Sequence, residues 1–391
     1  MFKGEGDVGR RPLDGVRVLD FSRVLAGPYC TALLADLGAE VIKVEPPAGD
    51  DYRHVGPFRD GESLLFQSVN RGKKSIVLDL KSEAGKRSAL ALVATCDVML
   101  ENFRPGVMER FGLGAHSLCK AFPKLVYVSL SGFGQTGPNN ARPAYDIIIQ
   151  AMSGLMDVTG EENGPPMMVG EALGDVAGGL FAAFGTMVAL FDRERSGRGR
   201  FVDLSLFDSL VSMMPIAACR ALIAGENPKR TGNRHALSAP FGTYQARDGH
   251  FAVAVLNDRL FQHFTSAIGQ PQLAEDPRFV SDILRRKHEP DLAGYIESWA
   301  ATLDADAAVD CLTQAGIPAA PLRSVMQAWS SPQVEARALA SHVTHPTLGT
   351  LLVPEQPVHF NDVPRGGREA APELGAHTDD ILKNLKIGGS K

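Results

Sequence analysis

Asp175 is the residue of this sequence best suited to nucleophilic chemistry. It lies in the segment Ala172–Gly179, where its neighbours are small or apolar and three of them are glycine. A carboxylate without bulky polar neighbours can be approached closely by a substrate carbonyl and can attack it. The competing interpretation is a helix N-cap, because Asp is a common capping residue and an apolar run follows from Val176 to Leu190. The two interpretations are compatible, since a helix N-terminus favours the ionised form that a nucleophile needs.

The first part of the chain alternates short apolar segments with helical ones. We expect strands at 17–21, 40–45, 75–80, 98–101, 125–130 and 200–206, and helices at 27–38 and 176–193. This alternation is typical of a parallel sheet covered by helices and predicts a doubly wound, Rossmann-like α/β domain. Glycines inside the helix that follows Asp175 cost about 1 kcal/mol each relative to alanine, so we expect another element to approach that face closely.

Familiar nucleotide and hydrolase motifs are missing from this framework. Glu45 ends the second expected strand, where an acid would hold the ribose of a nicotinamide nucleotide, but the first turn, Leu25–Cys30, lacks GxGxxG. The segment around Gly72 does not fit a phosphate-binding P-loop, and neither GxSxG nor HExxH occurs. The sequence therefore disfavours a dehydrogenase, an NTPase, a serine hydrolase of this type and a zinc protease.

The length of 391 residues suits two domains. Composition shifts to Gly, Asn and Pro near 224–229, and the chain becomes extended and rich in Pro and Gly after 318. We predict a large α/β domain over residues 1–224, a smaller α+β domain over 225–330, and a segment, 331–391, that returns to the large domain.

Charge and cysteine usage limit the partners. A formal net charge of −5 argues against nucleic acid, so an anionic ligand has to meet a local basic cluster. Nowhere do eighteen apolar residues run together, which argues against a membrane span. The five cysteines are scattered without zinc-site spacing, and the first residues, Met1–Arg11, contain no apolar signal segment. We expect a cytoplasmic protein with reduced thiols.

An ordered series of motifs spans the chain. It comprises Arg17–Asp20, Leu25–Pro28, Leu34–Ala39, Val41–Glu45, Glu101–Gly106, Ser131–Gly134, Arg142–Asp146, the Asp175 segment and Gly232–His235. Taken together, these motifs resemble the class III coenzyme A transferase family, also called the CaiB/BaiF family.

The resemblance implies that Asp175 attacks the thioester of an acyl-CoA donor. A mixed anhydride and then an aspartyl-CoA thioester form, and an acceptor carboxylic acid takes the CoA by the reverse steps. CoA is the moiety transferred, and no metal or prosthetic group is needed. Backbone N–H groups near Gly178 and Gly179 are candidates to stabilise the developing oxyanions. Family members are interlaced homodimers, so a homodimer is implied.

The resemblance also assigns contacts to CoA. Motif positions carried over from the family are Leu25, Ala26, Leu78, Lys81, Asn102, Phe103, Arg110, Tyr145 and Asp146. For the phosphates of CoA, guanidinium and ammonium groups are available at Arg71, Lys73, Lys74, Arg104 and Arg110. The alternative for any single Lys or Arg is a solvated surface position.

Tyr145 favours transfer over the other chemistry of the family. Racemases of the family use a His at this position to move an α-proton, and a tyrosine with a reference pKa near 10 is a poor base. An acyl-CoA racemase or isomerase remains the first alternative, and a CoA-binding protein without turnover the second. Formyl-CoA:oxalate members carry consecutive glycines in the second domain, and none occurs between Arg230 and Gly249. We therefore favour a small dicarboxylate pair, such as succinyl-CoA and a second acid, over oxalate.

Overall fold

The computed structural model describes residues 10–363 and 365–385, and the chain divides into two compact units. The large unit comprises Met1–Leu155, Met168–Cys219 and Pro332–Lys391, and the small unit comprises Met156–Met167 and Arg220–Ser331. Most of the N-terminal segment on which we based the absence of a signal sequence, residues 1–9, lies outside the described residues.

The boundaries of these units differ from the expected division. Residues 156–167, which we assigned to the large domain, belong to the small unit because their polar groups pair with it. The Gly232 N–H donates to Gly160 O at 3.0 Å, and Arg230 Nη1 lies 3.1 Å from Asp157 Oδ1. Such pairing between distant segments is invisible to a composition shift.

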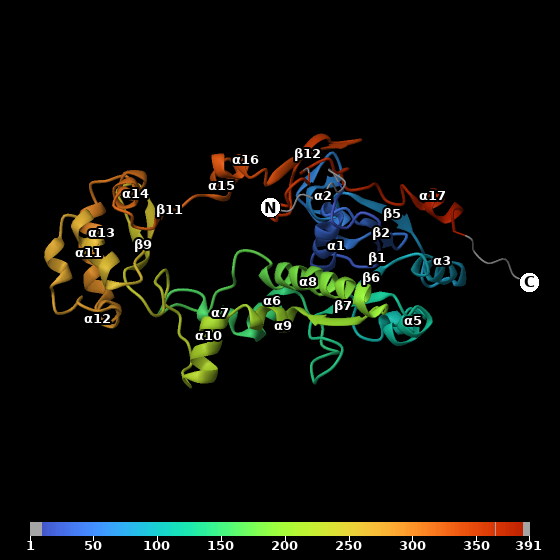
Figure 1. Ribbon diagram of the computed structural model, residues 1–391, viewed down its shortest axis with the longest axis horizontal. Coiled ribbons are helices and arrows are strands. Elements are labelled where there is room, and N and C mark those ends of the chain that lie inside the picture. Colours follow the sequence, from blue (N-terminus) through green and yellow to red (C-terminus); the bar gives the residue numbers. More distant parts are fainter. Residues whose placement is uncertain (1–9, 364, 386–391) are drawn as a thin grey trace, which may run out of the picture. The chain divides into compact units, whose positions relative to one another are not determined.

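A six-stranded parallel sheet forms the centre of the large unit (Figure 1). Its strands are β1 (Arg17–Asp20), β2 (Glu40–Glu45), β5 (Lys73–Val77), β6 (Val98–Glu101), β7 (Val126–Ser131) and β8 (Phe201–Ser205). Their order is β5-β2-β1-β6-β7-β8, so the direction of winding reverses between β1 and β6. This is the predicted doubly wound, Rossmann-like architecture, and ligands of such sheets bind at the reversal, outside the carboxyl ends of the strands.

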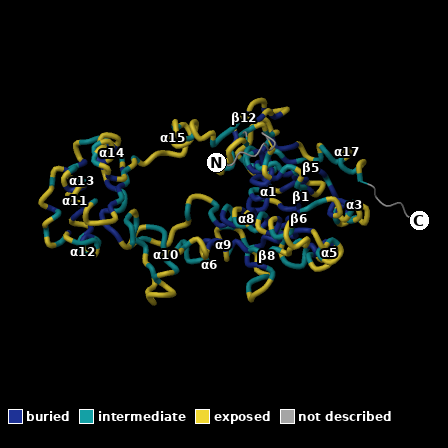
Figure 2. Tube along the Cα trace, in the orientation of Figure 1, coloured by how far each residue is buried: buried dark blue, intermediate teal, exposed yellow. Residues whose placement is uncertain are grey.

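Alternate residues of the central strands enter two different cores. Figure 2 shows that the trace of the large unit is most deeply buried along its central strands. One face packs against α1 (Ala26–Asp36), α6 (Asp146–Ser153), α8 (Leu173–Ser196) and α9 (Leu206–Ser212). The other face packs against α3 (Glu83–Val93), α4 (Val107–Arg110) and α5 (Ala115–Ala121). Both faces are covered, as the near-continuous apolar strands require.

The large unit has further elements outside this sheet. Its further elements are η1 (Asp51–His54), β3 (Phe58–Arg59), β4 (Glu62–Ser63), α2 (Leu64–Asn70), α10 (Pro215–Ala218), α16 (Pro332–Ala336), β12 (Ala340–His345), β13 (Gly349–Pro354) and α17 (Thr378–Lys383). The C-terminal segment covers the edge strand β5, where Val77 N–H donates to Thr378 Oγ1 at 3.0 Å. Closing the edge in this way protects it from pairing with another chain.

The small unit is an α+β structure with its own core. Its three-stranded antiparallel sheet has the order β11-β10-β9, formed by β9 (Phe241–Gln245), β10 (His250–Ala254) and β11 (Ala319–Pro321). The helices are α11 (Asp258–Ala267), α12 (Asp282–Lys287), α13 (Glu289–Ala300), α14 (Ala305–Gln314) and α15 (Val325–Trp329). Buried Phe251, Phe261, Phe264 and Phe279 fill its centre.

Glycines let α8 lie very close to its neighbours, as the sequence predicts. A β-carbon placed on Gly179 would lie 2.6 Å from the Ala26 carbonyl oxygen of α1 and 3.0 Å from the Tyr29 ring. A backbone oxygen cannot move aside as a flexible side chain can. Gly179 is therefore needed for the packing of the helix that contains Asp175.

We expect Gly179→Ala to lower the melting temperature by several degrees, since overpacking a rigid contact costs about 1–3 kcal/mol. Gly294→Ala is the matched control, because Gly294 is also inside a helix but its added β-carbon meets nothing within 4 Å. The control should stabilise the protein by up to about 1 kcal/mol. Thermal unfolding of both variants checks this, and a Gly179→Ala protein as stable as the wild type would contradict the close packing.

Candidate active site

A cavity of about 150 Å³ lies at the carboxyl edge of the sheet, where the winding reverses. We call it the Asp175 pocket. It is lined by the segments that follow β1, β6 and β7, by η1, and by the first turns of α8 and α9: Arg23, Val24, Leu25, Ala26, Asp51, Asn102, Phe103, Arg104, Leu130, Ser131, Gly132, Ala144, Tyr145, Asp175 and Leu206. The sheet topology alone predicts a ligand at this position.

Asp175 is the third residue of α8 and does not cap it. The N-cap residue is Ala172, which has no side chain able to accept a hydrogen bond, and the Asp175 carboxylate makes no hydrogen bond to any residue within 10–363 or 365–385. The capping interpretation of Asp175 is therefore wrong. Its oxygens remain free to face a substrate in the pocket.

Asp146, from the start of α6, performs the capping instead. Its Oδ1 accepts hydrogen bonds from the N–H groups of Gly174 at 2.7 Å and Asp175 at 3.4 Å, and its Oδ2 accepts one from Gln150 Nε2 at 2.6 Å. We predicted Asp146 as a CoA contact, but both its oxygens have partners in the protein: Oδ1 binds the start of α8, and Oδ2 binds Gln150 of its own helix. Its position makes it a support for Asp175.

The environment of Asp175 raises its pKa to about 7, first through burial and second through the negative charge of Asp146. We expected the helix N-terminus to favour ionisation, and the opposite holds because burial and a like charge outweigh the helix dipole. At neutral pH the group is divided between its acid and carboxylate forms. Only the carboxylate is a nucleophile.

A second cavity, of about 180 Å³, lies beyond the ends of β2 and β5. We call it the distal pocket, and its lining residues are Phe21, Ser22, Arg23, Lys43, Val44, Glu45, Pro46, Asp50, Leu78, Asp79, Leu80, Lys81, Phe103 and Phe111. Arg23 and Phe103 line both cavities, and the Arg23 guanidinium lies 5.5 Å from the centre of the Phe103 ring. The two pockets thus adjoin across this pair.

Most of the CoA contacts expected from the sequence lie around these two pockets. Leu25, Ala26, Asn102, Phe103, Arg104 and Tyr145 line the Asp175 pocket, while Leu78 and Lys81 line the distal pocket. Tyr145 is 72% exposed at the N-terminus of α6, so it is not a core packing residue. Arg110, at the end of α4, lies outside both pockets.

Arg71 and Lys73 are not available to phosphate, contrary to our prediction. The Arg71 guanidinium is buried against Asp36, with Nε 3.2 Å from Oδ1. Lys73 Nζ is fully buried and donates to Asp20, Asn70 and the Pro28 carbonyl oxygen. A buried cation with its partners in place cannot be withdrawn from them without a large electrostatic cost. Lys74 is paired with Glu40 at the sheet edge, but this pair is partly exposed, so burial does not exclude Lys74 as a phosphate contact.

Arg23 is the cation that the sequence reasoning missed. It immediately precedes Val24-Leu25-Ala26 in the turn after β1, and its exposed guanidinium lies 3.1 Å from Asp51 Oδ2. The rule that ligands bind at the carboxyl ends of strands beside the reversal would have identified this turn.

Gly178 and Gly179 do not supply oxyanion donors. They lie in the second turn of α8, where N–H groups are consumed by the helix itself. Their function is the close packing described above. The prediction that they stabilise the oxyanion is therefore wrong.

The chain is similar to known proteins along nearly its full length. The family model CoA-transferase family III matches residues 13–378. The acetyl-CoA:oxalate CoA-transferase of Acetobacter aceti is 43% identical over 384 residues, with 97% of each chain covered. The succinyl-CoA:glutarate CoA-transferase of Mus musculus is 40% identical over 378 residues, covering 96% of this chain and 86% of that one.

A solved structure of a CaiB/BaiF family protein from Brucella suis is 36% identical and superposes with a TM-score of 0.86, covering 96% of this chain and 100% of the other. The fold, the family model and the similar enzymes agree along nearly the full length. The chain therefore belongs to CoA-transferase family III and is an enzyme that transfers CoA between an acyl-CoA and an acid.

Proposed function

We propose that Asp175 is the covalent nucleophile of this transfer. The observation that supports it is the free carboxylate of Asp175 in a pocket at the carboxyl edge of the sheet, where the winding reverses and where expected CoA contacts gather. The other acid that lines the Asp175 pocket is Asp51, and its carboxylate is exposed and paired with Arg23.

The reaction then consists of two exchanges at the same carboxyl group. Asp175 attacks the thioester carbon of the donor, the C–S bond breaks, and CoA leaves as a thiolate from a mixed anhydride. The thiolate attacks the aspartyl carbonyl carbon, the anhydride C–O bond breaks, and the donor acid leaves as a carboxylate. An acceptor carboxylate then repeats these steps in reverse and restores the Asp175 carboxylate. No proton is gained or lost overall.

Each attack creates an oxyanion that needs donors. The N–H groups of Ala26 and Gly27, the first two residues of α1, have no intrahelical acceptor, and Ala26 lines the Asp175 pocket. We propose these N–H groups, in place of those of Gly178 and Gly179, for oxyanion stabilisation.

CoA is proposed to extend from the distal pocket to the Asp175 pocket, with its thioester at Asp175. Arg23 and Phe103 line both cavities, so the arm of CoA would pass this pair. Arg23 and Arg104 are exposed guanidinium groups beside that path and suit phosphate.

We expect Arg23→Gln to raise the KM for acyl-CoA about tenfold, because a hydrogen bond to a charged group contributes about 1.5–3 kcal/mol. The turnover number should change far less, since the phosphates are remote from the reacting carbon. Arg87→Gln, on the exposed surface of α3, is the control. Steady-state kinetics with acyl-CoA as the varied substrate check this, and equal KM values for the two variants would exclude a phosphate contact at Arg23.

The acids exchanged are proposed to be small dicarboxylates. The similar enzymes are named for acetyl-CoA with oxalate and for succinyl-CoA with glutarate. The similarity to the first of them restores oxalate as a candidate acceptor, which the lack of consecutive glycines had disfavoured. A panel of acetyl-, succinyl- and glutaryl-CoA donors against oxalate, succinate and glutarate acceptors, with product masses recorded, tests this. No exchange with any dicarboxylate would refute the substrate class.

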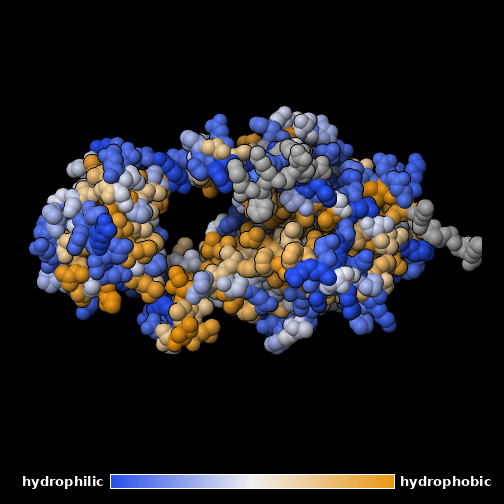
Figure 3. Space-filling view, in the orientation of Figure 1, coloured by the Kyte–Doolittle hydropathy of each residue, from blue (hydrophilic) through white to orange (hydrophobic). Residues whose placement is uncertain are grey.

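We propose that the exposed apolar face of α8 is the interface of a homodimer. Figure 3 shows apolar surface over the part of the large unit where α8 lies. Leu180, Phe184, Val188 and Phe191 recur at helical spacing along it and are 51–66% exposed. This helix is long and apolar enough to cross a membrane, but half of its most apolar part is buried in the large unit, as in a core helix. A second copy of this chain would cover the remaining apolar stripe.

We expect Phe184→Glu to convert a dimer into monomer, because a charge in an apolar interface lacks a partner. Leu90→Glu, at an exposed apolar position of α3, is the control and should leave the assembly unchanged. Sedimentation velocity separates these outcomes, and a wild-type monomer, or a Phe184→Glu dimer, would contradict the proposed interface.

A further inference from the structure

The turn between β1 and α1, residues 22–25, is the wall shared by the two pockets. Ser22 and Arg23 line the distal pocket, and Arg23, Val24 and Leu25 line the Asp175 pocket. The position of this turn therefore shapes both the proposed CoA path and the space in front of Asp175.

Side chains hold the first part of this turn. Ser22 N–H donates to Asp20 Oδ1 at 2.9 Å, and Ser22 O accepts from Lys43 Nζ at 2.9 Å. The Asn102 amide accepts from Arg23 N–H at 2.9 Å and donates to Arg23 O at 2.8 Å. Each polar backbone group from Ser22 N–H to Arg23 O thus has a side-chain partner.

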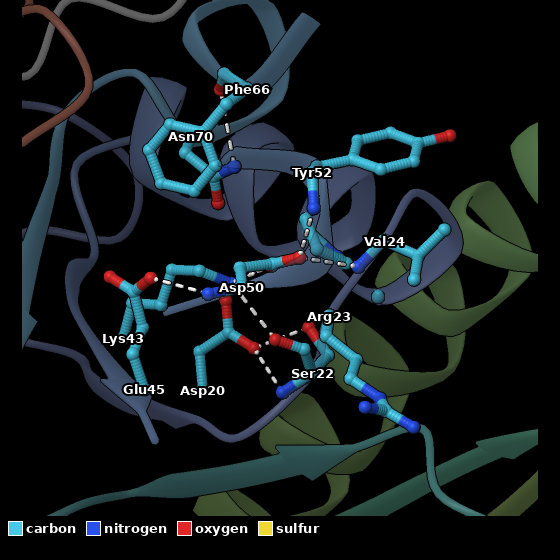
Figure 4. A network of polar contacts seen from close by, with 12 residues as sticks. Asp20, Ser22, Arg23, Val24, Lys43, Glu45, Asp50, Tyr52, Phe66 and Asn70 are labelled. Carbon is cyan, nitrogen blue, oxygen red and sulfur yellow. Dashed lines mark hydrogen bonds and ion pairs between the residues drawn. The ribbon is translucent and has the colours of Figure 1, made fainter. Parts of the chain in front are cut away.

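Val24 is the residue at which the turn is strained. Its φ is +69°, in the left-handed region that a β-branched residue avoids. Its N–H donates to Asp50 Oδ1 at 3.0 Å, and the same oxygen accepts from Tyr52 N–H at 3.0 Å (Figure 4). A strained residue persists only where its surroundings hold it, and here the Asp50 carboxylate does so.

Asp50 is itself fixed in place. It is 1% exposed, its N–H donates to Glu45 Oε2 at 3.0 Å, and its Oδ2 lies 2.7 Å from Lys43 Nζ. Lys43 is fully buried; burial disfavours its charge, but Asp50, Asp20 and Glu45 hold its pKa above the ordinary value. The same ammonium group donates to Ser22 O, so the ion pair binds the turn at Ser22 through Lys43 and at Val24 through Asp50.

We infer that Asp50 is a positioning residue of the enzyme, whose carboxylate holds Val24 in the left-handed turn and thereby sets the wall of the Asp175 pocket. This inference rests on the proposed binding of acyl-CoA in that pocket. Buried ion pairs contribute little net stability, whereas backbone strain concentrates where geometry serves function. A displacement of about 1 Å at a reacting site can cost about a hundredfold in rate.

The test separates the hydrogen bond to Val24 from the ion pair. Two double variants lack the ion pair equally: D50N/K43M keeps an acceptor oxygen for Val24 N–H, and D50L/K43M does not. We expect kcat/KM to be about a hundredfold lower for D50L/K43M than for D50N/K43M. When Val24→Gly is added to both, the ratio should fall below about fivefold, because glycine adopts a positive φ without help.

A ratio that is the same with Val24 and with glycine at this position would overturn the inference, since Asp50 would then act only through stability. So would a ratio below about threefold with Val24 present. The comparison uses ratios within each background, so it does not require the Val24→Gly enzyme to keep full activity.

A measurement on the otherwise wild-type chain covers the case in which the double variants do not fold. Val24→Gly and Val24→Ala both remove the isopropyl group, but only glycine tolerates φ +69°. Val24→Gly should melt several degrees above Val24→Ala, and an equal or lower melting temperature would overturn the inference. This readout is independent of the chemistry at Asp175, so failure of the proposed nucleophile and failure of the Asp50 inference are distinguishable.

Discussion

Asp175→Asn is expected to lower kcat by at least about four orders of magnitude, because an amide cannot form the anhydride and loss of a nucleophile removes the covalent pathway entirely. The substitution is nearly isosteric, and Asp175 makes no side-chain hydrogen bond among the residues described in the structure. Binding of free CoA should therefore stay within about threefold of the wild type.

Asp192→Asn is the matched control for this prediction. Asp192 lies near the other end of α8 and is paired with Arg200 on the surface, where an ion pair contributes little. Steady-state kinetics and calorimetric titration with CoA check both variants. An Asp175→Asn enzyme with more than about a hundredth of wild-type kcat would contradict a nucleophilic role.

Asp146 is expected to control both the placement and the protonation of Asp175. The pKa of Asp175 is about 7, so the fraction present as carboxylate, and with it kcat/KM, should rise about tenfold per pH unit below 7 and level off above it. Tyr52, on η1, has a pKa raised to about 12, first by burial and next by the charge of Asp175, and stays neutral over this range. The other charged groups of the pocket are Arg23, Asp51 and Arg104.

Asp146→Asn and Asp146→Ala separate the two effects. Both remove the negative charge that raises the pKa of Asp175, so both should move the acid limb of the pH profile to lower pH. Only Asn keeps an oxygen for Gly174 N–H. We expect the plateau of kcat/KM to fall about a hundredfold for Ala, through loss of the cap and misplacement of Asp175, and less than about tenfold for Asn.

The full pH dependence of kcat/KM for the three proteins, with melting temperatures recorded in parallel, checks this prediction. In Asp146→Asn the new side-chain NH2 group would face the NH2 group of Gln150. This contact lowers stability, which the melting temperature records, whereas the position of the acid limb reports the ionisation of Asp175. An acid limb that stays near pH 7 in both variants would show that Asp146 does not influence the ionisation of Asp175.

The sheet and the placement of Asp175 follow from the sequence for a simple reason. Apolar strands that alternate with helices predict a parallel sheet, and a parallel sheet brings all its carboxyl-end turns to one edge. The sequence therefore predicts that Leu25 and Asp175, which are far apart in the chain, lie near the same edge, even though it does not give their contacts. The close approach to Gly179 could also be predicted, because glycine destabilises the interior of a helix and is expected there mainly where another element packs closely.

The partners of charged residues could not be predicted in the same way. Lys73 at the start of a strand has the same sequence appearance whether it faces phosphate or pairs with Asp20 inside the protein. The cap of α8 comes from Asp146, almost thirty residues earlier, so the local pattern around Asp175 pointed to the wrong carboxylate. The strain at Val24 could not be predicted either, because valine disfavours a positive φ and the sequence gives no sign of one there.

Detection of the covalent intermediate tests the central claim most directly. The enzyme is incubated with acyl-CoA in the absence of acceptor, treated with borohydride, which reduces an aspartyl thioester to an alcohol, and digested for mass spectrometry. We predict that the peptide containing Asp175 is reduced at that residue in the wild type and unmodified in Asp175→Asn. An unmodified Asp175 peptide in an enzyme that still exchanges CoA between acids would contradict the account.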